Sequence, residues 1–252
     1  MDSGQKKIID IGFDFTLDSQ NYWDGFWERN SGLGAGQVDP DTASKTLQRY
    51  HQILWSRELP CGETMDLSCG TGPYYLTWKD FRFGSDTIIL GFRYQKLQQL
   101  MEEVSRMLPD YKKYAEDLVH KAYTIGGTTI FPKHVNSINQ RKGTNQLIGD
   151  RWDLTLECIR RYYRGEHSAL YETLTKDKEF FDLFVDFKGY VEFFLFQDCV
   201  TEDYTKVDIW LGDGGFTQSP FPKNAQEYFS FMDRQFSFLD KRNKRIDQFA
   251  NQ

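Results

Sequence analysis

The hydrophobic pattern of this sequence changes about halfway along the chain, and that change limits the folds open to it. Residues 9–17 alternate apolar and polar side chains, which is typical of a half-buried strand. By contrast, segments 145–163 and 225–249 carry apolar residues at helical spacing. The regular strand–helix alternation of a doubly wound sheet is not present. The sequence therefore predicts an α+β fold, with mostly antiparallel strands in the N-terminal half and a mostly helical C-terminal half.

The remaining elements follow from shorter periodic runs bounded by turn residues. We expect a helical region to break at Pro109, because proline cannot sit inside a helix without a kink. The further expected strands are 63–69, 73–79, 87–92 and 123–131. The further expected helices are 42–57, 96–121, 168–175 and 178–197.

The chain is long enough for one sizeable core, and nothing in it marks a second domain. Its 252 residues lie near the upper limit that one hydrophobic core supports, and no Pro-, Gly- or Ser-rich linker divides them. Aromatic residues make up 16% of the chain, so we expect a core dominated by rings. The sequence predicts a single globular domain over residues 1–252.

Charge and cysteine usage exclude several classes of protein. A formal net charge of -6 argues against a surface built as a whole to grip nucleic acid or an anionic membrane. The most apolar stretch, residues 180–196, is interrupted by charged side chains and cannot span a membrane. The cysteines and histidines are dispersed, so we expect no disulfide, no structural zinc or other metal and no cofactor, in a cytoplasmic protein. The four cysteines are Cys61, Cys69, Cys158 and Cys199.

Residues 66–72, with the sequence DLSCGTG, invite comparison with the glycine turn of methyltransferases that use S-adenosylmethionine. That turn needs a buried apolar strand before it and a helix after it. Among the residues just before Asp66, only Met65 is apolar. After Gly72, where the helix should begin, the sequence continues with Pro73 and the strand-like run YYLTW. We therefore predict a hairpin over Met65–Thr77, with the methyltransferase as an unfavoured alternative.

Segment 133–164 is unusually basic for this acidic chain. It carries seven Lys or Arg against three Asp or Glu, and its first part is dense in hydrogen-bonding side chains. On a helical wheel for residues 145–163, Asp153 and Glu157 fall opposite the apolar stripe, which predicts surface charges, and Glu157 is spaced to pair with Arg161. Arg151 instead falls near the edge of the apolar stripe. A buried arginine needs a carboxylate or an anionic ligand, so we expect Arg151 to be buried against one or the other.

Several segments of the chain together resemble a family of bacterial proteins catalogued only as a domain of unknown function. They are YTIGG at 123–127, IFP at 130–132, SIN at 137–139 and DRWDLTLECIRRYY at 150–163. The likeness extends over nearly the whole chain. It implies no activity, substrate or catalytic residue, so any functional hypothesis has to come from the residues themselves.

Three functional hypotheses remain after this comparison. The first is a site for a phosphorylated or otherwise anionic ligand, such as a nucleotide or a nucleic-acid end, built from Asn139, Arg141, Asp150 and Arg151, because arginine forks bind phosphate through paired hydrogen bonds. The second is a protein-interaction module, or a homo-oligomer, that docks through exposed aromatics such as Trp23 and Trp27. The third is the methyltransferase. No catalytic constellation can be assigned, which leaves open whether the protein is an enzyme.

Overall fold

A computed structural model describes seven stretches of the chain: residues 58–68, 75–88, 98–110, 125–142, 147–149, 151–212 and 222–250. The strand expected at 9–17, the helix expected at 42–57 and the aromatic residues Trp23 and Trp27 lie outside these stretches. In the part described, strands come before most of the helices, so the fold is α+β as the sequence predicts.

The sheet has four strands, and each pairs with its neighbour in the chain in antiparallel fashion. They are β1 (Asp66–Ser68), β2 (Tyr75–Trp78), β3 (Phe81–Thr87) and β4 (Thr128–Pro132). In the first pair Asp66 lies opposite Thr77 and Ser68 opposite Tyr75, so the hairpin prediction is confirmed. The glycine turn itself lies outside the described residues, but an antiparallel strand follows where a methyltransferase would need a helix.

Two strands differ from the expected ones. A strand that was not expected, β3, follows a turn at Lys79 and Asp80, where Lys79 has a φ of 50°, and residues 89–92 of the strand expected at 87–92 lie outside the described stretches. The fourth strand begins at Thr128, and residues Ile125–Gly127 form a short 3-10 turn, η2. All five residues of β4 are buried, so both faces of this strand are covered.

The helices of the second half follow in short elements up to the last one. They are α6 (Trp152–Tyr163), α7 (Tyr171–Lys176), α8 (Lys178–Asp182), α9 (Phe187–Phe193) and α10 (Ala225–Ala250). Two 3-10 turns accompany them, η3 (Ile138–Gln140) and η4 (Gln197–Cys199). Before them, α4 (Gln98–Met107) ends ahead of Pro109 as expected. The helix expected at 178–197 is divided into α8 and α9, and the one expected from residue 145 begins at 152.

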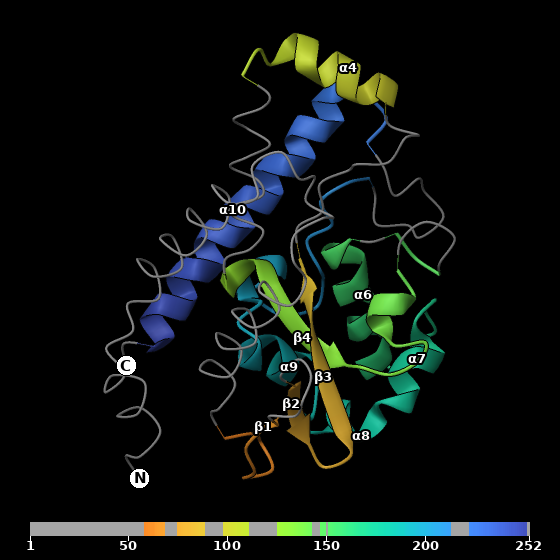
Figure 1. Cartoon of the computed structure of the whole chain (residues 1–252), viewed down its shortest axis with the longest axis vertical. Helices are drawn as coiled ribbons and strands as arrows, with labels where there is room; N and C mark the ends of the chain where they lie inside the picture. Colours follow the sequence, from red (N-terminus) through yellow and green to blue (C-terminus); the bar gives the residue numbers. More distant parts are fainter. Residues whose placement is uncertain are drawn as a thin grey trace.

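The core is a cluster of packed rings between the sheet and the short helices, which lie beside β3 and β4 in Figure 1. Phe180 of α8 packs on Phe83 of β3, with ring centroids 5.1 Å apart. On the neighbouring strand, Phe131 contacts Trp152 at the start of α6. Burial of so many rings supplies the main driving force for this part of the fold.

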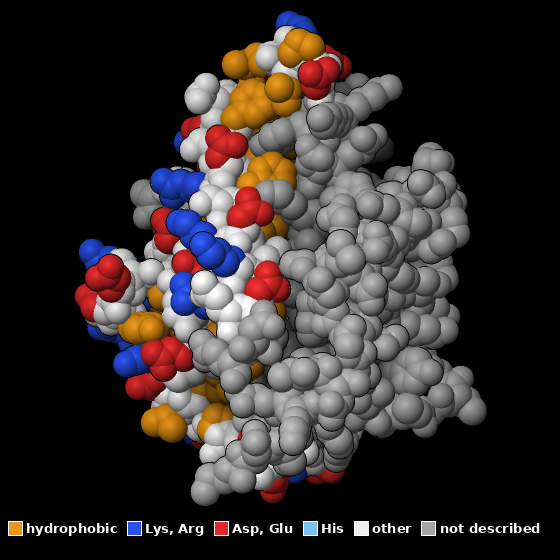
Figure 2. Space-filling view, turned by 90° about the vertical axis from the view of Figure 1, so that its left-hand side faces the viewer, with side chains coloured by type: hydrophobic (Ala, Val, Ile, Leu, Met, Phe, Trp, Pro, Cys, Tyr) orange, Lys and Arg blue, Asp and Glu red, His pale blue; other side chains and the backbone are white. Residues whose placement is uncertain are grey.

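The longest helix, α10, runs diagonally past the sheet, and α4 lies across one of its ends (Figure 1). The predicted apolar stripe is confirmed, since Met232, Leu239 and Ile246 are buried and Phe229 and Phe236 pack partly against the core. Its outward face carries interspersed positive and negative side chains (Figure 2). Among the described residues, no helix is both long and apolar enough to cross a membrane.

Candidate functional site

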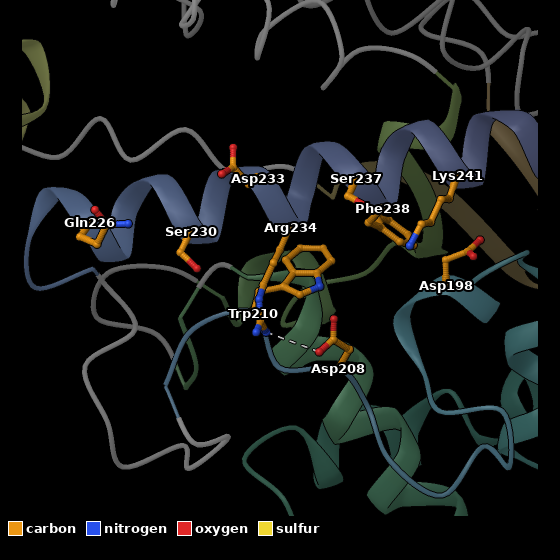
Figure 3. Close-up of a pocket in the computed structure, with 10 residues that line it drawn as sticks. All are labelled: Asp198, Asp208, Trp210, Gln226, Ser230, Asp233, Arg234, Ser237, Phe238 and Lys241. Atoms are coloured by element: carbon orange, nitrogen blue, oxygen red, sulfur yellow. Dashed lines mark hydrogen bonds and ion pairs between the residues drawn. The ribbon is translucent and has the colours of Figure 1, made fainter. Parts of the chain in front are cut away.

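An open pocket of about 420 Å³ lies between α10 and the segment 198–210 that follows α9 (Figure 3). We call it the α10 pocket. Its volume falls in the range of sites that hold small molecules. The side chains that line it are those of Asp198, Asp208, Trp210, Gln226, Ser230, Asp233, Arg234, Ser237, Phe238 and Lys241.

One wall of the pocket is a single face of α10. Gln226, Ser230, Ser237 and Lys241 are spaced four, seven and four residues apart, which places them along one side of a helix. In the part of the chain that the structure describes, none of these four side chains forms a hydrogen bond or ion pair with another residue. They therefore present an uncommitted set of hydrogen-bonding groups to whatever enters the pocket.

The opposite wall comes from the segment before α10, and Phe238 of α10 joins Trp210 of that segment in the floor. Asp198 is held by Arg245 through two parallel bonds, Nε to Oδ2 and Nη2 to Oδ1, each 3.0 Å. Nη1 of Arg234 donates to the carbonyl of Ile209 at 2.7 Å and lies 3.5 Å from the carboxylate of Asp208. The buried rings of Trp210 and Phe238, with centroids 5.5 Å apart, form the floor.

Two charged residues that line the pocket, Asp233 and Lys241, have no partner among the described residues. Arg245 offsets Asp198, and Arg234 offsets Asp208. Figure 3 shows the carboxylate of Asp233 directed away from Trp210, whereas the ammonium of Lys241 is directed toward the side on which Phe238 and Asp198 lie. Within the described residues Lys241 has no carboxylate partner, so it is the group best placed to meet a charge on a ligand.

The structure supports the prediction that Arg151 is buried against a carboxylate. Its side chain is 3% exposed, and its guanidinium forms two parallel hydrogen bonds with Asp153, of which Nε to Oδ1 is 3.0 Å. Arg151 does not belong to the helix, however. It is the residue before α6 and has extended backbone angles. The neighbouring Asp150 lies outside the described residues.

The prediction that Asp153 and Glu157 are surface charges is wrong, because both side chains are buried. The first two turns of α6, residues 152–159, are buried on every side, so this part of the helix has no outward face. Asp153 is nevertheless satisfied, since Arg151 pairs with it and the backbone N–H of Trp210 donates to its Oδ2 at 2.9 Å. The expected pairing of Glu157 with Arg161 is confirmed at 2.8 Å.

Asn139 and Arg141 do not bond directly to Arg151. Asn139 lies half-buried in η3, and Arg141 follows it, with its carbonyl accepting from the backbone N–H groups of Leu147 and Ile148. Arg151 forms no hydrogen bond or ion pair with either side chain among the contacts of the described residues. Because Asp150 lies outside the described residues, the site predicted from Asn139, Arg141, Asp150 and Arg151 stays a prediction.

Most of the other basic side chains in segment 133–164 are paired inside the protein. Lys142 pairs with Asp86 of β3, and Arg164 with Glu166. Burial raises the pKa of Glu157, but hydrogen bonds from Arg160 and Arg161 outweigh this effect and hold its pKa below the ordinary value. The basic excess of this segment is thus largely taken up by carboxylates within the fold.

The two buried cysteines are not reactive thiols, and the described residues contain no metal site. Burial raises the pKa of the Cys158 thiol to about 11 and that of Cys199 well above its usual range, so both stay protonated at neutral pH. No group of three or more His, Cys, Asp or Glu side chains among the described residues is arranged to hold a metal ion.

The residues of the α10 pocket were missed by the sequence reasoning. Gln226, Ser230, Ser237 and Lys241 lie on the polar side of an amphipathic helix, which normally faces solvent. Asp208 and Trp210 lie in a segment without clear periodicity. The absence of salt-bridge partners at i±4 of Lys241 is a faint signal, but nothing local to α10 indicates that another segment lies opposite this face.

Comparison with known proteins identifies a family but no activity. The model of DUF6994, a family of unknown function, matches residues 9–246. No curated protein and no solved structure gives a significant match.

Proposed function

The chain belongs to this family of unknown function, and from the geometry of the α10 pocket we propose that it binds a small polar molecule that carries an anionic group. The ligand class we favour is a phosphorylated or carboxylated molecule with several hydroxyl groups, such as a sugar phosphate or a mononucleotide. Binding alone is proposed, with no reaction attached.

The observation that carries the proposal is the set of uncommitted polar side chains on one wall of the pocket. Gln226, Ser230, Ser237 and Lys241 are exposed, and they line a concavity of about 420 Å³, which is within the size range of small-molecule sites. The ammonium of Lys241 supplies a compact positive charge for a phosphate or carboxylate. Ser230, Ser237 and Gln226 can donate to or accept from hydroxyl groups of the same ligand.

The wall that carries Asp198 and Asp208 disfavours a ligand with negative charges alone. Asp208 lies 3.5 Å from Arg234, so its carboxylate keeps acceptor capacity for a ligand hydroxyl or amino group. A molecule with an anionic end at Lys241 and hydroxyl groups toward Asp208 complements both walls. A polyanion without such donors would face Asp208 and Asp198 at a cost in electrostatic energy.

We keep the class of ligand expected from the sequence, an anionic molecule, but propose a different site for it, the α10 pocket. In segment 136–164 the cations Arg151, Lys142 and Arg160 already have carboxylate partners, and an anion there would have to displace them. Lys241 is free of such competition. The site built from Asn139, Arg141, Asp150 and Arg151 therefore remains a separate prediction and is not the one we favour.

Thermal unfolding with a ligand panel tests the proposal, because a ligand that binds the folded state raises the melting temperature. We expect stabilisation by members of a panel of sugar phosphates and mononucleotides, and none by the corresponding unphosphorylated sugars and nucleosides. Titration calorimetry on the best member should show at least tenfold weaker binding by Lys241→Gln, which corresponds to about 1.4 kcal/mol.

The matched control is Lys244→Gln, which removes the same charge from an exposed position on the same helix outside the pocket. Its affinity should equal that of the wild type. A panel without any stabilising anionic member, or a Lys241→Gln variant that binds as tightly as the wild type, overturns the proposal.

A further inference from the structure

A buried ion pair behind the α10 pocket is joined to the pocket floor through the main chain. Oδ2 of Asp153 accepts a hydrogen bond from the backbone N–H of Trp210 at 2.9 Å. Nη2 of Arg151 donates to the carbonyl of the next residue, Leu211, at 3.1 Å. Two consecutive residues are therefore held by the two members of one ion pair, which itself lies 57 or more positions earlier in the chain.

From this arrangement we infer that Arg151 and Asp153 are positioning residues that set the place of Trp210 in the floor of the α10 pocket, and through it the affinity of the site. The inference about affinity rests on the proposed function, whereas the inference about Trp210 does not. Arg151 and Asp153 do not line the pocket, so they act on a ligand only through Trp210 and Leu211.

The contacts around Trp210 explain why its backbone has to be held. Its ring packs between Phe231 and Phe238, with centroid separations of 6.2 and 5.5 Å. The Arg151 guanidinium lies 5.5 Å from the centroid of the same Phe231 ring. Loss of these two bonds would leave the backbone on either side of the 210–211 peptide unheld, and a displacement of Trp210 would move its indole relative to Phe231 and Phe238 and change the shape of the pocket floor.

The ion pair is also fully desolvated, since Arg151 is 3% and Asp153 0% exposed. Desolvation cancels much of the Coulomb energy of a pair buried so deeply. We therefore assign this pair a role in geometry and not in net stability. Its geometry is specific here. The planar guanidinium bonds the two oxygens of the carboxylate through two different nitrogens, Nε and Nη2, and Nη2 also donates to the Leu211 carbonyl.

The variant Arg151→Lys separates charge compensation from positioning. A lysine ammonium can neutralise Asp153, but its donors all lie on one nitrogen and do not reproduce the fixed fork that joins the carboxylate to the Leu211 carbonyl. We expect a folded protein in which Trp210 is no longer held in one place. The matched control is Ile159→Val, which trims the buried core at a position on α6 that forms neither of the bonds to Trp210 and Leu211.

Fluorine NMR of protein labelled with 5-fluorotryptophan reports on Trp210 directly, and Trp210→Phe assigns its resonance. The Trp210 resonance should shift or broaden in Arg151→Lys and stay unchanged in Ile159→Val. With glucose 6-phosphate as the probe, the affinity should fall at least fivefold in Arg151→Lys and remain that of the wild type in Ile159→Val. An unmoved Trp210 resonance in Arg151→Lys overturns the inference.

The same experiment distinguishes this inference from the proposed function. A moved Trp210 resonance in a protein that does not bind the panel of anionic ligands supports the positioning role and removes the proposed function.

Should Arg151→Lys fail to fold, amide exchange of the wild type decides instead. The Trp210 N–H is bonded to a buried carboxylate and should exchange far more slowly than that of Ile209, which has no such bond among the described contacts. Equal exchange of the two amides overturns the inference.

Discussion

Glu157 illustrates how single side chains hold the charged part of α6 together. It accepts hydrogen bonds from Arg160 at 2.7 and 2.9 Å and from Arg161 at 2.8 Å, one turn further along the helix. Both arginines lie near the end of α6, where positive charge also favours the helix dipole. One buried carboxylate therefore compensates two cations, and its ionisation state matters for folding.

We predict that Glu157→Gln lowers the free energy of unfolding by about 2 kcal/mol at pH 7, because charged hydrogen bonds to two arginines are weakened. The folded-state pKa of Glu157 lies below its ordinary value near 4.5, so its stabilising contribution is complete above that pH and disappears as the pH falls through the folded-state pKa. Urea unfolding from pH 7 to pH 3 should show the two proteins converging at the acidic end. The control is Glu172→Gln, which removes an exposed carboxylate on α7 that has no described partner, and its free energy of unfolding at pH 7 should equal that of the wild type. A difference between Glu157→Gln and the wild type that stays constant across the pH range contradicts the prediction.

At the scale of elements, the junction between α8 and α9 shows why one expected helix is two. Asp186 begins α9 by accepting a hydrogen bond from the backbone N–H of Gly189 at 2.7 Å, which is a helix cap. A Cβ at Gly189 would lie 2.1 Å from the carbonyl oxygen of Phe184, so only glycine allows the chain to fold back this closely. Val185, in the link between α8 and α9, has a φ of 67° and is 86% exposed.

We predict that Val185→Gly stabilises the protein by about 0.5–1 kcal/mol, since a β-branched residue is strained at positive φ and glycine is not. The exposed side chain makes little packing contribution that could be lost. Val135 is 81% exposed but does not have a positive φ, so Val135→Gly should be destabilising by a similar amount through the entropy of the unfolded chain. Chemical denaturation of the three proteins measures both effects, and a destabilised Val185→Gly would argue against strain at this position.

At the scale of the whole molecule, α10 connects segments that are far apart in the sequence. Arg242 is fully buried and donates to the carbonyls of Gly126 and Thr128, each at 2.7 Å, and to that of Phe194 at 3.0 Å. Its guanidinium also lies 4.2 Å from the ring centroid of Phe196. Burial lowers the pKa of Arg242 to about 9, so the group remains charged at neutral pH. The helix thereby ties η2, β4 and the end of α9 to one another.

We predict that Arg242→Leu destabilises the protein by about 3 kcal/mol, because three buried carbonyls lose their donor while a buried charge is also removed. Hydrogen exchange should then show lower protection in β4 and α9 as well as in α10, with unfolding still a single transition if residues 1–252 form one domain. Lys244→Leu, at an exposed position two residues further along, should stay within about 0.5 kcal/mol of the wild type. Loss of protection confined to α10 would contradict the role of Arg242 as a link between elements.

The sequence alone determined those features that depend on neighbours along the chain. Alternation and a turn predicted the β1–β2 hairpin, helical spacing predicted the buried side of α10, and the four-residue spacing of Glu157 and Arg161 predicted their ion pair. Arg151 is buried as predicted, but the helical wheel used for that prediction does not apply to it, because Arg151 precedes α6 and has extended backbone angles.

The tertiary structure decided which surfaces are covered and by what. Asp153 was expected at the surface because periodicity describes one helix in isolation, yet the backbone of Trp210, 57 residues away, covers and bonds it. The α10 pocket exists for the same reason, because segment 198–210 lies opposite a helix face that would otherwise be an ordinary solvated one. Contacts between distant segments depend on the packing of all elements at once, and no local pattern in the chain encodes that packing.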